Sequence, residues 1–279
     1  MQPFPRPFRH LLVFTALGCL PALAQQPAPS PSPKPTVHPH PPAPFLPGGK
    51  WHVNDLQRPA PPVVAPGTFP TPDAAAKPPS DAIVLFDGTD VSQWESVKGG
   101  PAPWQIVDGA MVTAQTDIQT KQKFGDLQIH VEYAEPTPPT GSSQGRGNSG
   151  VFLMGQFEIQ VLDNYGNPTY PDGMATAVYA QTPPMANACR PPGDWQVYDI
   201  AFTTPRLDPK GNVATPAYVT VFHNGVLVQN HTPIMGPTGP GRLTDYHSVH
   251  TSEGPLRLQY HNGAVRYRSV WVRPLVAPQ

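Results

Sequence analysis

Residues 81–275 are predicted to form an all-β domain, a sandwich or a barrel, on three observations. Short runs of alternating apolar and polar residues recur along this stretch, most clearly in residues 126–133, and such alternation is typical of strands with one buried face. Asn-Gly pairs at residues 224–225 and 262–263 separate neighbouring runs, as type I′ hairpin turns do. No stretch of ten or more residues has helical periodicity, and no internal repeat indicates a propeller.

The strands follow one another in chain order, and each is identified by its alternation. In residues 126–133 the side chains at odd positions from Leu127 are apolar, whereas those at even positions from Gln128 are polar. Successive side chains of a strand point to opposite sides, so one face of this strand can be buried. The further predicted strands cover residues 151–153, 157–162, 195–202, 217–222, 226–229, 256–260 and 265–272.

A secretory signal peptide is predicted for residues 1–24. Two arginines precede an apolar run that is too short to span a bilayer, and an Ala-Leu-Ala cleavage pattern ends at Ala24. We expect the protein to be exported to the periplasm or out of the cell. Lipidation at Cys19 is the less favoured alternative, because Ala16 stands where lipoprotein signals usually carry leucine.

A proline-rich linker is predicted for residues 25–80. Of the 42 prolines, 22 fall within the first 80 residues, where charged residues are sparse. Proline fixes φ and lacks a backbone donor, so we expect this segment to be extended and disordered. A chain that starts near Pro79 should then melt at the same temperature as the mature chain. The remaining residues, 81–275, have the size of one domain.

The charge balance excludes two classes of partner. A formal net charge of −1 gives no electrostatic basis for binding nucleic acid or an anionic membrane. After removal of the signal, no apolar stretch is long enough for a transmembrane segment. Cys189 would be the one cysteine of the mature chain, so no internal disulfide is expected.

Residues 145–165 carry the most informative pattern of side chains. The run 157–162 places Glu158 and Gln160 on one face and apolar residues on the other. Asp163 would point away in strict alternation, but a bulge near the end of the run would bring it beside Glu158, and bulges often lie next to active sites. Two carboxylates could then face one sugar-sized ligand. The alternative is a solvated strand face that ends in a turn.

Seven segments occur in one order between Ile83 and Leu275. They read IVLFDGTDVSQWES, FGDLQIHVEY, GRGNSGVFLMGQFEIQVLDNYGNPTYPDG, ACRPPGDWQVYDIAF, VTVFHNGVLVQNH, GPTGPG and GPLRLQYHNGAVRYRSVWVRPL. In this order they resemble the 3-keto-disaccharide hydrolase domain family. The resemblance implies a concanavalin A-like jelly-roll sandwich with a carbohydrate groove. It also implies an exported bacterial protein that acts on a carbohydrate, a 3-keto-glycoside or 3-keto-disaccharide.

The resemblance further implies which side chains form the site. The implied catalytic residues are Glu158, Asp163 and His261, and the implied substrate-binding residues are Arg146, Asn148, Gln160 and Arg268. Glu158, Gln160 and Asp163 match the family's Glu-Ile-Gln-Val-Leu-Asp strand. His261 and Arg268 match its closing hairpin, where Asn262 and Ser269 depart from the family pattern.

A 3-keto-glycoside can be cleaved by elimination, because its ketone acidifies the proton at C2. A base removes that proton, the enolate expels the glycosidic oxygen from C1, and water adds back. In the implied site Glu158 would be the base, Arg146 or His261 would stabilise the enolate, and Asp163 or His261 would protonate the leaving group. A divalent metal could replace these donors. The sequence has no compact spacing of metal ligands, so no cofactor is assigned.

Two other functions remain open. Glu158 and Asp163 could hydrolyse an ordinary glycoside as paired carboxylates, although Gln160 stands where such strands usually carry a third acid. A jelly roll could instead bind carbohydrate without cleaving it, because a fold does not fix a function. A binding module would tolerate Glu158→Gln, whereas an enzyme would not.

Overall fold

The computed structural model describes residues 65–275 and, before them, residues 44–45, 49–50, 52–53, 57, 60 and 63. The predicted signal peptide, residues 1–24, lies outside the described residues, as do Cys19 and much of the predicted linker. The chain separates into two units, Met1–Arg58 and Pro59–Gln279, and the second unit holds the sandwich. Among the described residues there is no helix long and apolar enough to cross a membrane.

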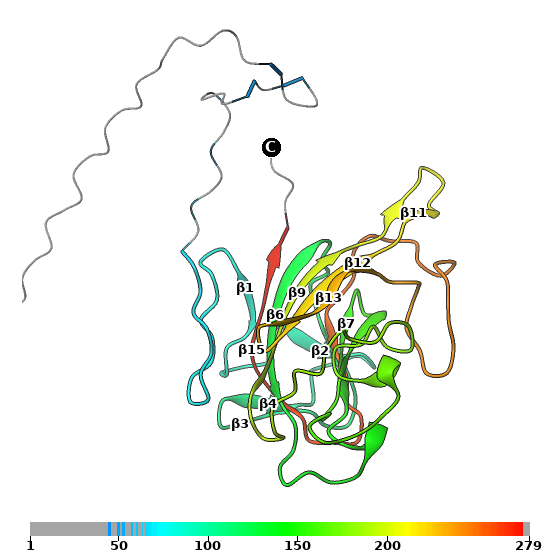
Figure 1. Cartoon of the computed structure of the whole chain (residues 1–279). Helices are drawn as coiled ribbons and strands as arrows, with labels where there is room; N and C mark the ends of the chain where they lie inside the picture. Colours follow the sequence, from blue (N-terminus) through cyan, green and yellow to red (C-terminus); the bar gives the residue numbers. More distant parts are fainter. Residues whose placement is uncertain are drawn as a thin grey trace, which may run out of the picture. The chain divides into compact units, whose positions relative to one another are not determined.

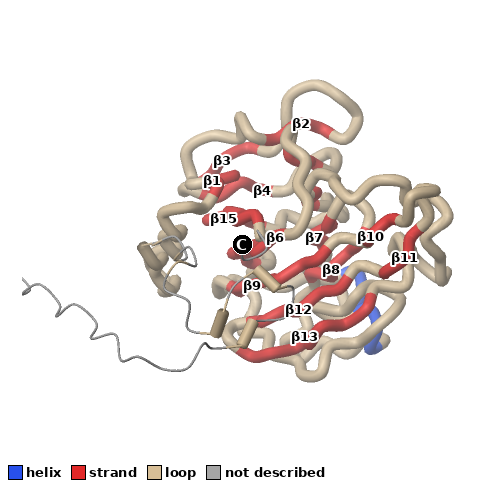
Figure 2. The backbone as a smooth tube through the Cα atoms, turned by 90° about the horizontal axis from the view of Figure 1, so that it is seen from above, coloured by secondary structure: helices blue, strands red, loops and turns tan. Residues whose placement is uncertain are grey.

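The predicted all-β jelly-roll sandwich is confirmed, with two sheets and two short 3-10 helices (Figure 1). The larger sheet has eight strands in the order β13-β12-β9-β6-β15-β4-β3, with β1 paired to β15; most of this order can be followed from above in Figure 2. Its strands are β13 (Val226–Pro233), β12 (Tyr218–His223), β9 (Gln196–Thr203), β6 (Leu127–Ala134), β15 (Arg266–Pro274), β4 (Ala110–Val112), β3 (Gln105–Val107) and β1 (Ile83–Phe86).

The smaller sheet has five strands in the order β2-β5-β14-β7-β8. They are β2 (Trp94–Ser96), β5 (Ile118–Thr120), β14 (Arg257–Leu258), β7 (Ser149–Leu153) and β8 (Phe157–Val161). A separate pair joins β10 (Arg206–Leu207) to β11 (Val213–Thr215), and the 3-10 helices are η1 (Ser143–Gly145) and η2 (Pro171–Gly173).

The two Asn-Gly turns have different outcomes. Asn224 and Gly225 both have positive φ, 51° and 82°, and they join β12 to β13 as the predicted hairpin. The second prediction was wrong, because the chain crosses between sheets there. β14 pairs with β5 and β7 in the smaller sheet, whereas β15 pairs with β6, β4 and β1 in the larger one. Residues 261–263 therefore connect the two layers.

The core lies between the inner faces of the two sheets. Tyr133, Tyr198 and Tyr267 from the larger sheet face Val151 and Ile159 from the smaller one, and all five are fully buried. Buried hydroxyls need partners, and the Tyr198 hydroxyl donates to the Gln160 carbonyl at 2.8 Å.

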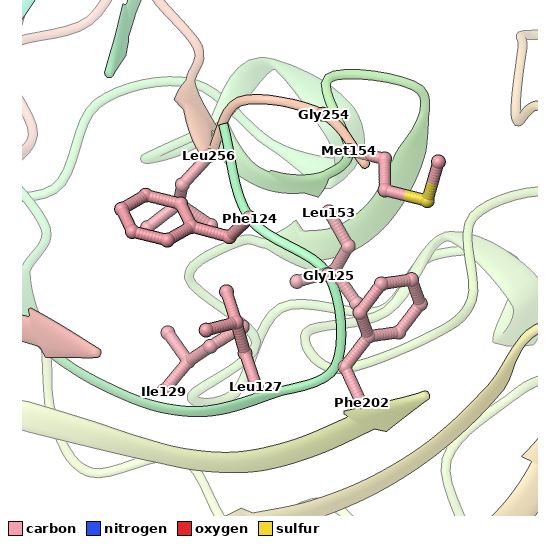
Figure 3. Close-up of a pocket in the computed structure, with 9 residues that line it drawn as sticks. All are labelled: Phe124, Gly125, Leu127, Ile129, Leu153, Met154, Phe202, Gly254 and Leu256. Carbon is pink, nitrogen blue, oxygen red and sulfur yellow. The ribbon is translucent and has the colours of Figure 1, made fainter. Parts of the chain in front are cut away.

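A small gap remains in this core (Figure 3). It measures about 10 Å³, close to the smallest space that holds one water molecule. It is lined by Phe124, Gly125, Leu127, Ile129, Leu153, Met154, Phe202, Gly254 and Leu256. No lining side chain carries a charge or a strong hydrogen-bonding group, so the gap reflects core packing and is no sugar site.

Residues 65–80, the last part of the predicted linker, form a loop held against the larger sheet. The amide of Ala76 donates to Glu132 Oε1 at 2.6 Å, and Ser269 Oγ donates to the Ala76 carbonyl at 2.8 Å. The Arg268 guanidinium donates to the Thr71 carbonyl at 2.8 Å. Glu132 is fully buried under this loop. Its carboxylate therefore depends on the loop for one of its hydrogen bonds, the one from the Ala76 amide.

These contacts change the expectation for a shortened chain. A chain that starts at Ala65 should keep the melting temperature of the mature protein. A chain that starts at Pro79 should melt about 4–10 °C lower, because buried Glu132 and Arg268 lose their backbone partners. Thermal unfolding followed by circular dichroism measures both. Equal melting temperatures would mean that the loop contributes nothing to stability.

Candidate functional site

One row of paired residues crosses the whole smaller sheet and reaches Glu158. Reading across the strands, Glu95 pairs with Gln119, Gln119 with Arg257, Arg257 with Phe152 and Phe152 with Glu158. Neighbours in these strands, such as Leu258 and Ile159, are buried in the core. Because side chains alternate along a strand, the row lies on the outer face of the sheet.

The row extends across the sheet past β8 to one further residue, Tyr179. Val178 forms a bridge with Ile159, and the Tyr179 amide donates to the Glu158 carbonyl at 3.1 Å. Tyr179 therefore lies opposite Glu158 on the same outer face. A cavity of about 530 Å³ opens beside Tyr179, with Tyr170 and Arg242 among its lining residues. That volume falls within the range of about 300–1,000 Å³ that small-ligand pockets occupy. Glu158 itself does not line the cavity.

Glu158 is a buried carboxyl group, 5% exposed, with no hydrogen bond from the described residues to its side chain. Burial raises its pKa to about 8, although the positive charge of Arg257 acts in the opposite direction. Gly150 on the neighbouring strand leaves space for the carboxyl group. A Cβ at that position would lie 2.5 Å from Glu158 Oε1 and 2.8 Å from the Phe152 ring.

Arg257 is the cation of this face. Its guanidinium carbon lies 3.8 Å from the centre of the Phe152 ring, and its Nε lies 3.8 Å from Asp117 Oδ2. That separation is too long for a hydrogen bond, and the buried Nε has no acceptor among the described residues. On the same strand end, Gln259 Oε1 is also buried without a donor. Buried polar atoms are normally satisfied, so the lack of a partner for these two is unusual.

Gln160 and Asn148 belong to a hydrogen-bonded network around Gln144. Gln160 Nε2 donates to Gln144 Oε1 at 3.0 Å, and Asn148 Nδ2 donates to the Gln144 carbonyl at 2.8 Å. Gln144 also donates to the Thr169 hydroxyl at 2.9 Å. Gln160 lies on the same outer face as Glu158, as predicted, whereas its amide nitrogen is already engaged within the protein.

Arg146 and Asp163 form an ion pair away from Glu158. Arg146 Nε donates to Asp163 Oδ2 at 2.6 Å, and Nη2 donates to the Tyr165 carbonyl at 2.8 Å. Asp163 is 1% exposed. The predicted bulge is absent, because the pairing of β7 with β8 runs without a shift from Ser149–Val161 to Leu153–Phe157. Nearby Glu135 is buried too, and burial raises its pKa to about 8.

The remaining predicted residues are spread over two places. Exposed His261 lines a cavity of about 180 Å³ together with Arg146 and Asn148. Arg268 lies on the larger sheet, where its Nε donates to Glu132 Oε2 at 2.7 Å and its guanidinium lies 4.1 Å from the Trp195 ring centre. The structure thus groups Glu158 with Gln160, and Arg146 with Asn148, Asp163 and His261, and places Arg268 apart.

Sequence reasoning missed Arg257, Gln259, Tyr179 and Asp117. A signal for the first two was present, since the run 256–260 alternates and puts both side chains on its polar face. No pattern indicated Asp117 or Tyr179. Asp117 directly precedes β5, and Tyr179 lies in a turn next to the bridge residue Val178, outside the named strands. Within the described residues, no three His, Cys, Asp or Glu side chains converge as a metal site.

The ion pair makes Arg146 a structural residue in our prediction. Arg146→Ala leaves the buried Asp163 carboxylate without its cation, so we expect a loss of about 3 kcal/mol in the free energy of unfolding. The melting temperature should fall by about 6–12 °C, while the binding of a keto-sugar at neutral pH stays within a factor of two. Unchanged stability together with lost binding would move Arg146 into the binding site.

The raised pKa of Glu158 predicts a dependence of stability on pH. Between its ordinary value of 4.5 and about 8, the folded protein holds a proton that the unfolded chain lacks, so stability falls as pH rises through this window. Glu158→Gln removes the ionisation. At pH 8.5 the variant should be at least about 2 kcal/mol more stable than the parent, and at pH 4, below the ordinary pKa, the two should match. Chemical denaturation at both pH values measures this, and equal stability at pH 8.5 would contradict it.

Comparison with known proteins adds to this geometry. The family model described as "3-keto-alpha-glucoside-1,2-lyase-like domain" matches residues 81–273. The chain is similar to a protein from Parabacteroides distasonis whose crystal structure is named "putative glycosyl hydrolase". The two share 48% sequence identity over 79% of this chain and 94% of that chain, with a TM-score of 0.74.

A second crystal structure of the same name, also from Parabacteroides distasonis, shares 19% identity over 70% of this chain and 94% of that chain. Its TM-score is 0.51, so it shows the likeness of the fold alone. No protein with a curated function matches the chain.

Proposed function

Because the chain belongs to the 3-keto-alpha-glucoside-1,2-lyase-like domain family, we propose that it cleaves 3-keto-glycosides by removing the proton at C2. The family and the similar structure at 48% identity support a carbohydrate-active, hydrolase-like protein. The observation that carries the finer proposal is that Glu158 and Arg257 both flank Phe152 on the outer face of the smaller sheet and interact electrostatically. One is a carboxyl group with a pKa of about 8 and no hydrogen bond, and the other is a guanidinium with an unpartnered Nε.

The proposed reaction starts at Glu158. A base is most effective when its pKa lies near the working pH, and a pKa of about 8 meets that condition. The carboxylate takes the proton from C2, the C1–O bond to the leaving group breaks, and a C1–C2 double bond forms. Water then adds, with its hydroxyl at C1 and a proton returning to C2, so that the net reaction is hydrolysis.

Arg257 takes the place proposed from sequence for Arg146 or His261. The enolate formed after proton removal carries negative charge on the oxygen at C3, and a preorganised cation stabilises it. Arg257 is within electrostatic reach of Glu158, whereas Arg146 is held by Asp163. The Tyr179 hydroxyl, raised in pKa by burial, keeps its proton at neutral pH and is the donor we assign to the leaving oxygen.

The test of this proposal is the fate of the C2 proton. In heavy water the product should carry deuterium at C2, and the plain glycoside without the 3-keto group should not react. Mass spectrometry and proton NMR of the product measure both. Unlabelled product with good activity on plain glycosides would favour direct hydrolysis at C1. That reading is already weakened by the placement of Asp163 with Arg146 rather than with Glu158. Binding of a sugar without turnover would indicate that the protein is a carbohydrate-binding module and no enzyme.

Export is the second part of the proposal, and the signal-like composition of residues 1–24 supports it. Periplasmic or secreted protein should begin at Gln25. Recovery of a membrane-bound form that carries lipid at Cys19 would show instead that the protein is a lipoprotein.

A further inference from the structure

A second cavity lies on the opposite side of the sandwich, between residues 65–80 and the outer face of the larger sheet. It measures about 410 Å³, enough for one monosaccharide. The loop supplies Phe69 and Lys77, and the sheet supplies His130 and Trp271. None of the residues of the Glu158 face lines it, so it is a separate site.

The loop wall of this cavity is fixed by close backbone contacts. Thr68 and Lys77 pair across the loop, with the Thr68 amide donating to the Lys77 carbonyl at 2.9 Å and the Lys77 amide to Thr68 Oγ1 at 2.9 Å. A Cβ at Gly67 would lie 2.3 Å from the Lys77 carbonyl oxygen. Only glycine therefore allows this approach, and the Ala76–Glu132 hydrogen bond ties the loop to the sheet.

The sheet wall is equally well ordered. His130 stacks on Trp271 with ring centres 5.0 Å apart and planes at 8°. Its Nδ1 lies 2.6 Å from Asp199 Oδ1, and its Nε2 lies 3.4 Å from Glu132 Oε1. One oxygen of the Asp199 carboxylate at this wall is therefore engaged by the imidazole, and the side chain is 43% exposed. Phe69, which is exposed, provides apolar surface of the kind that packs against the C–H face of a sugar ring, and the small accessible part of Trp271 adds to it.

The cavity holds more donors than acceptors. Lys77 and Arg190 line it, and neither forms an ion pair with a carboxylate among the described residues. The Arg190 guanidinium donates to the Trp195 carbonyl, which leaves further N–H groups free. Two exposed cations without a carboxylate partner favour an anionic ligand whose oxygen atoms accept from both.

We propose that this cavity binds a sugar acid, a monosaccharide with one carboxylate, with the carboxylate between Lys77 and Arg190 and the ring against Trp271 and Phe69. The site is independent of the Glu158 face and of any reaction there.

Titration calorimetry of the mature chain with D-glucuronate, D-glucose and acetate tests this proposal. Glucuronate should bind at least about tenfold more tightly than glucose or acetate, because only it offers both the charge and the ring. Lys77→Gln with Arg190→Gln should weaken glucuronate at least about tenfold. Both side chains are exposed, so this double variant should keep its melting temperature. Glu158→Gln should leave glucuronate binding unchanged.

A second variant tests the loop wall. Gly67→Ala forces the loop away from Lys77, so it should abolish glucuronate binding and leave turnover of a 3-keto-glycoside unchanged. The proposal is overturned by any of three results: no heat of binding with about 10 mM glucuronate, equal binding of glucose, or undiminished binding in the Lys77→Gln, Arg190→Gln protein. Loss of glucuronate binding in Glu158→Gln would place the ligand at the other face and overturn it as well.

Discussion

Replacing Glu158 with glutamine is expected to lower turnover of a 3-keto-glycoside by two or more orders of magnitude. General base catalysis typically contributes about 10²–10⁴-fold, and the amide cannot accept the C2 proton. Substrate binding should survive, because glutamine keeps the shape that fits over Gly150. Steady-state kinetics and calorimetric binding of the substrate, each with the same protein preparation, measure the two effects separately.

The pH profile decides the role of Glu158. With a pKa of about 8, only about a tenth of the carboxyl groups are ionised at pH 7. A base must be ionised, so kcat/KM of the parent should rise with pH and level off above about 8. A fall in kcat/KM across the same range would make Glu158 the acid instead.

Glu95→Gln is the matched control. Glu95 lies in the same row on the other edge strand and accepts a hydrogen bond from Gln119 at 3.0 Å. The change replaces a carboxyl group with an amide on the same face, away from Arg257 and Gly150. Its turnover should stay within a factor of two of the parent. Full activity in Glu158→Gln would remove this residue from the mechanism.

Alternation predicted the long strands because each has one buried and one outer face. β6, β8, β9 and β12 all lie within about one residue of their predicted ranges. The strands β2 to β5 are three residues long, too short for a period of two to stand out. Residues 65–80 gave no strand signal, since their position depends on Glu132 and Arg268, far along the chain.

The candidate site was predictable only where it depends on one strand. Glu158 and Gln160 share a face because they are two residues apart on β8. Asp163 does not join them, since β8 ends at Val161 without a bulge and Arg146 neutralises the carboxylate. His261 was misplaced because the chain changes sheets after β14. Such choices depend on tertiary pairing, which a local pattern does not contain.

Arg257→Met is expected to lower kcat by about two orders of magnitude or more, since loss of one group that stabilises developing charge typically costs about 10²–10³. Methionine preserves apolar contact with Phe152, over which the guanidinium lies at 3.8 Å. The native Nε has no hydrogen bond among the described residues, so the melting temperature should change little.

The same variant should also shift the titration of Glu158. Arg257 opposes the effect of burial on that carboxyl group, so its removal should raise the pKa further and move the rise in kcat/KM to higher pH. A purely structural residue would lower stability and leave the profile in place. Arg257→Lys retains the charge without the planar guanidinium, so it should restore the pH profile and only part of the turnover. If Arg257→Met keeps its turnover and its pH profile does not shift, the enolate must be stabilised by another group. The electrostatic interaction of Arg257 with Glu158 would then no longer support elimination.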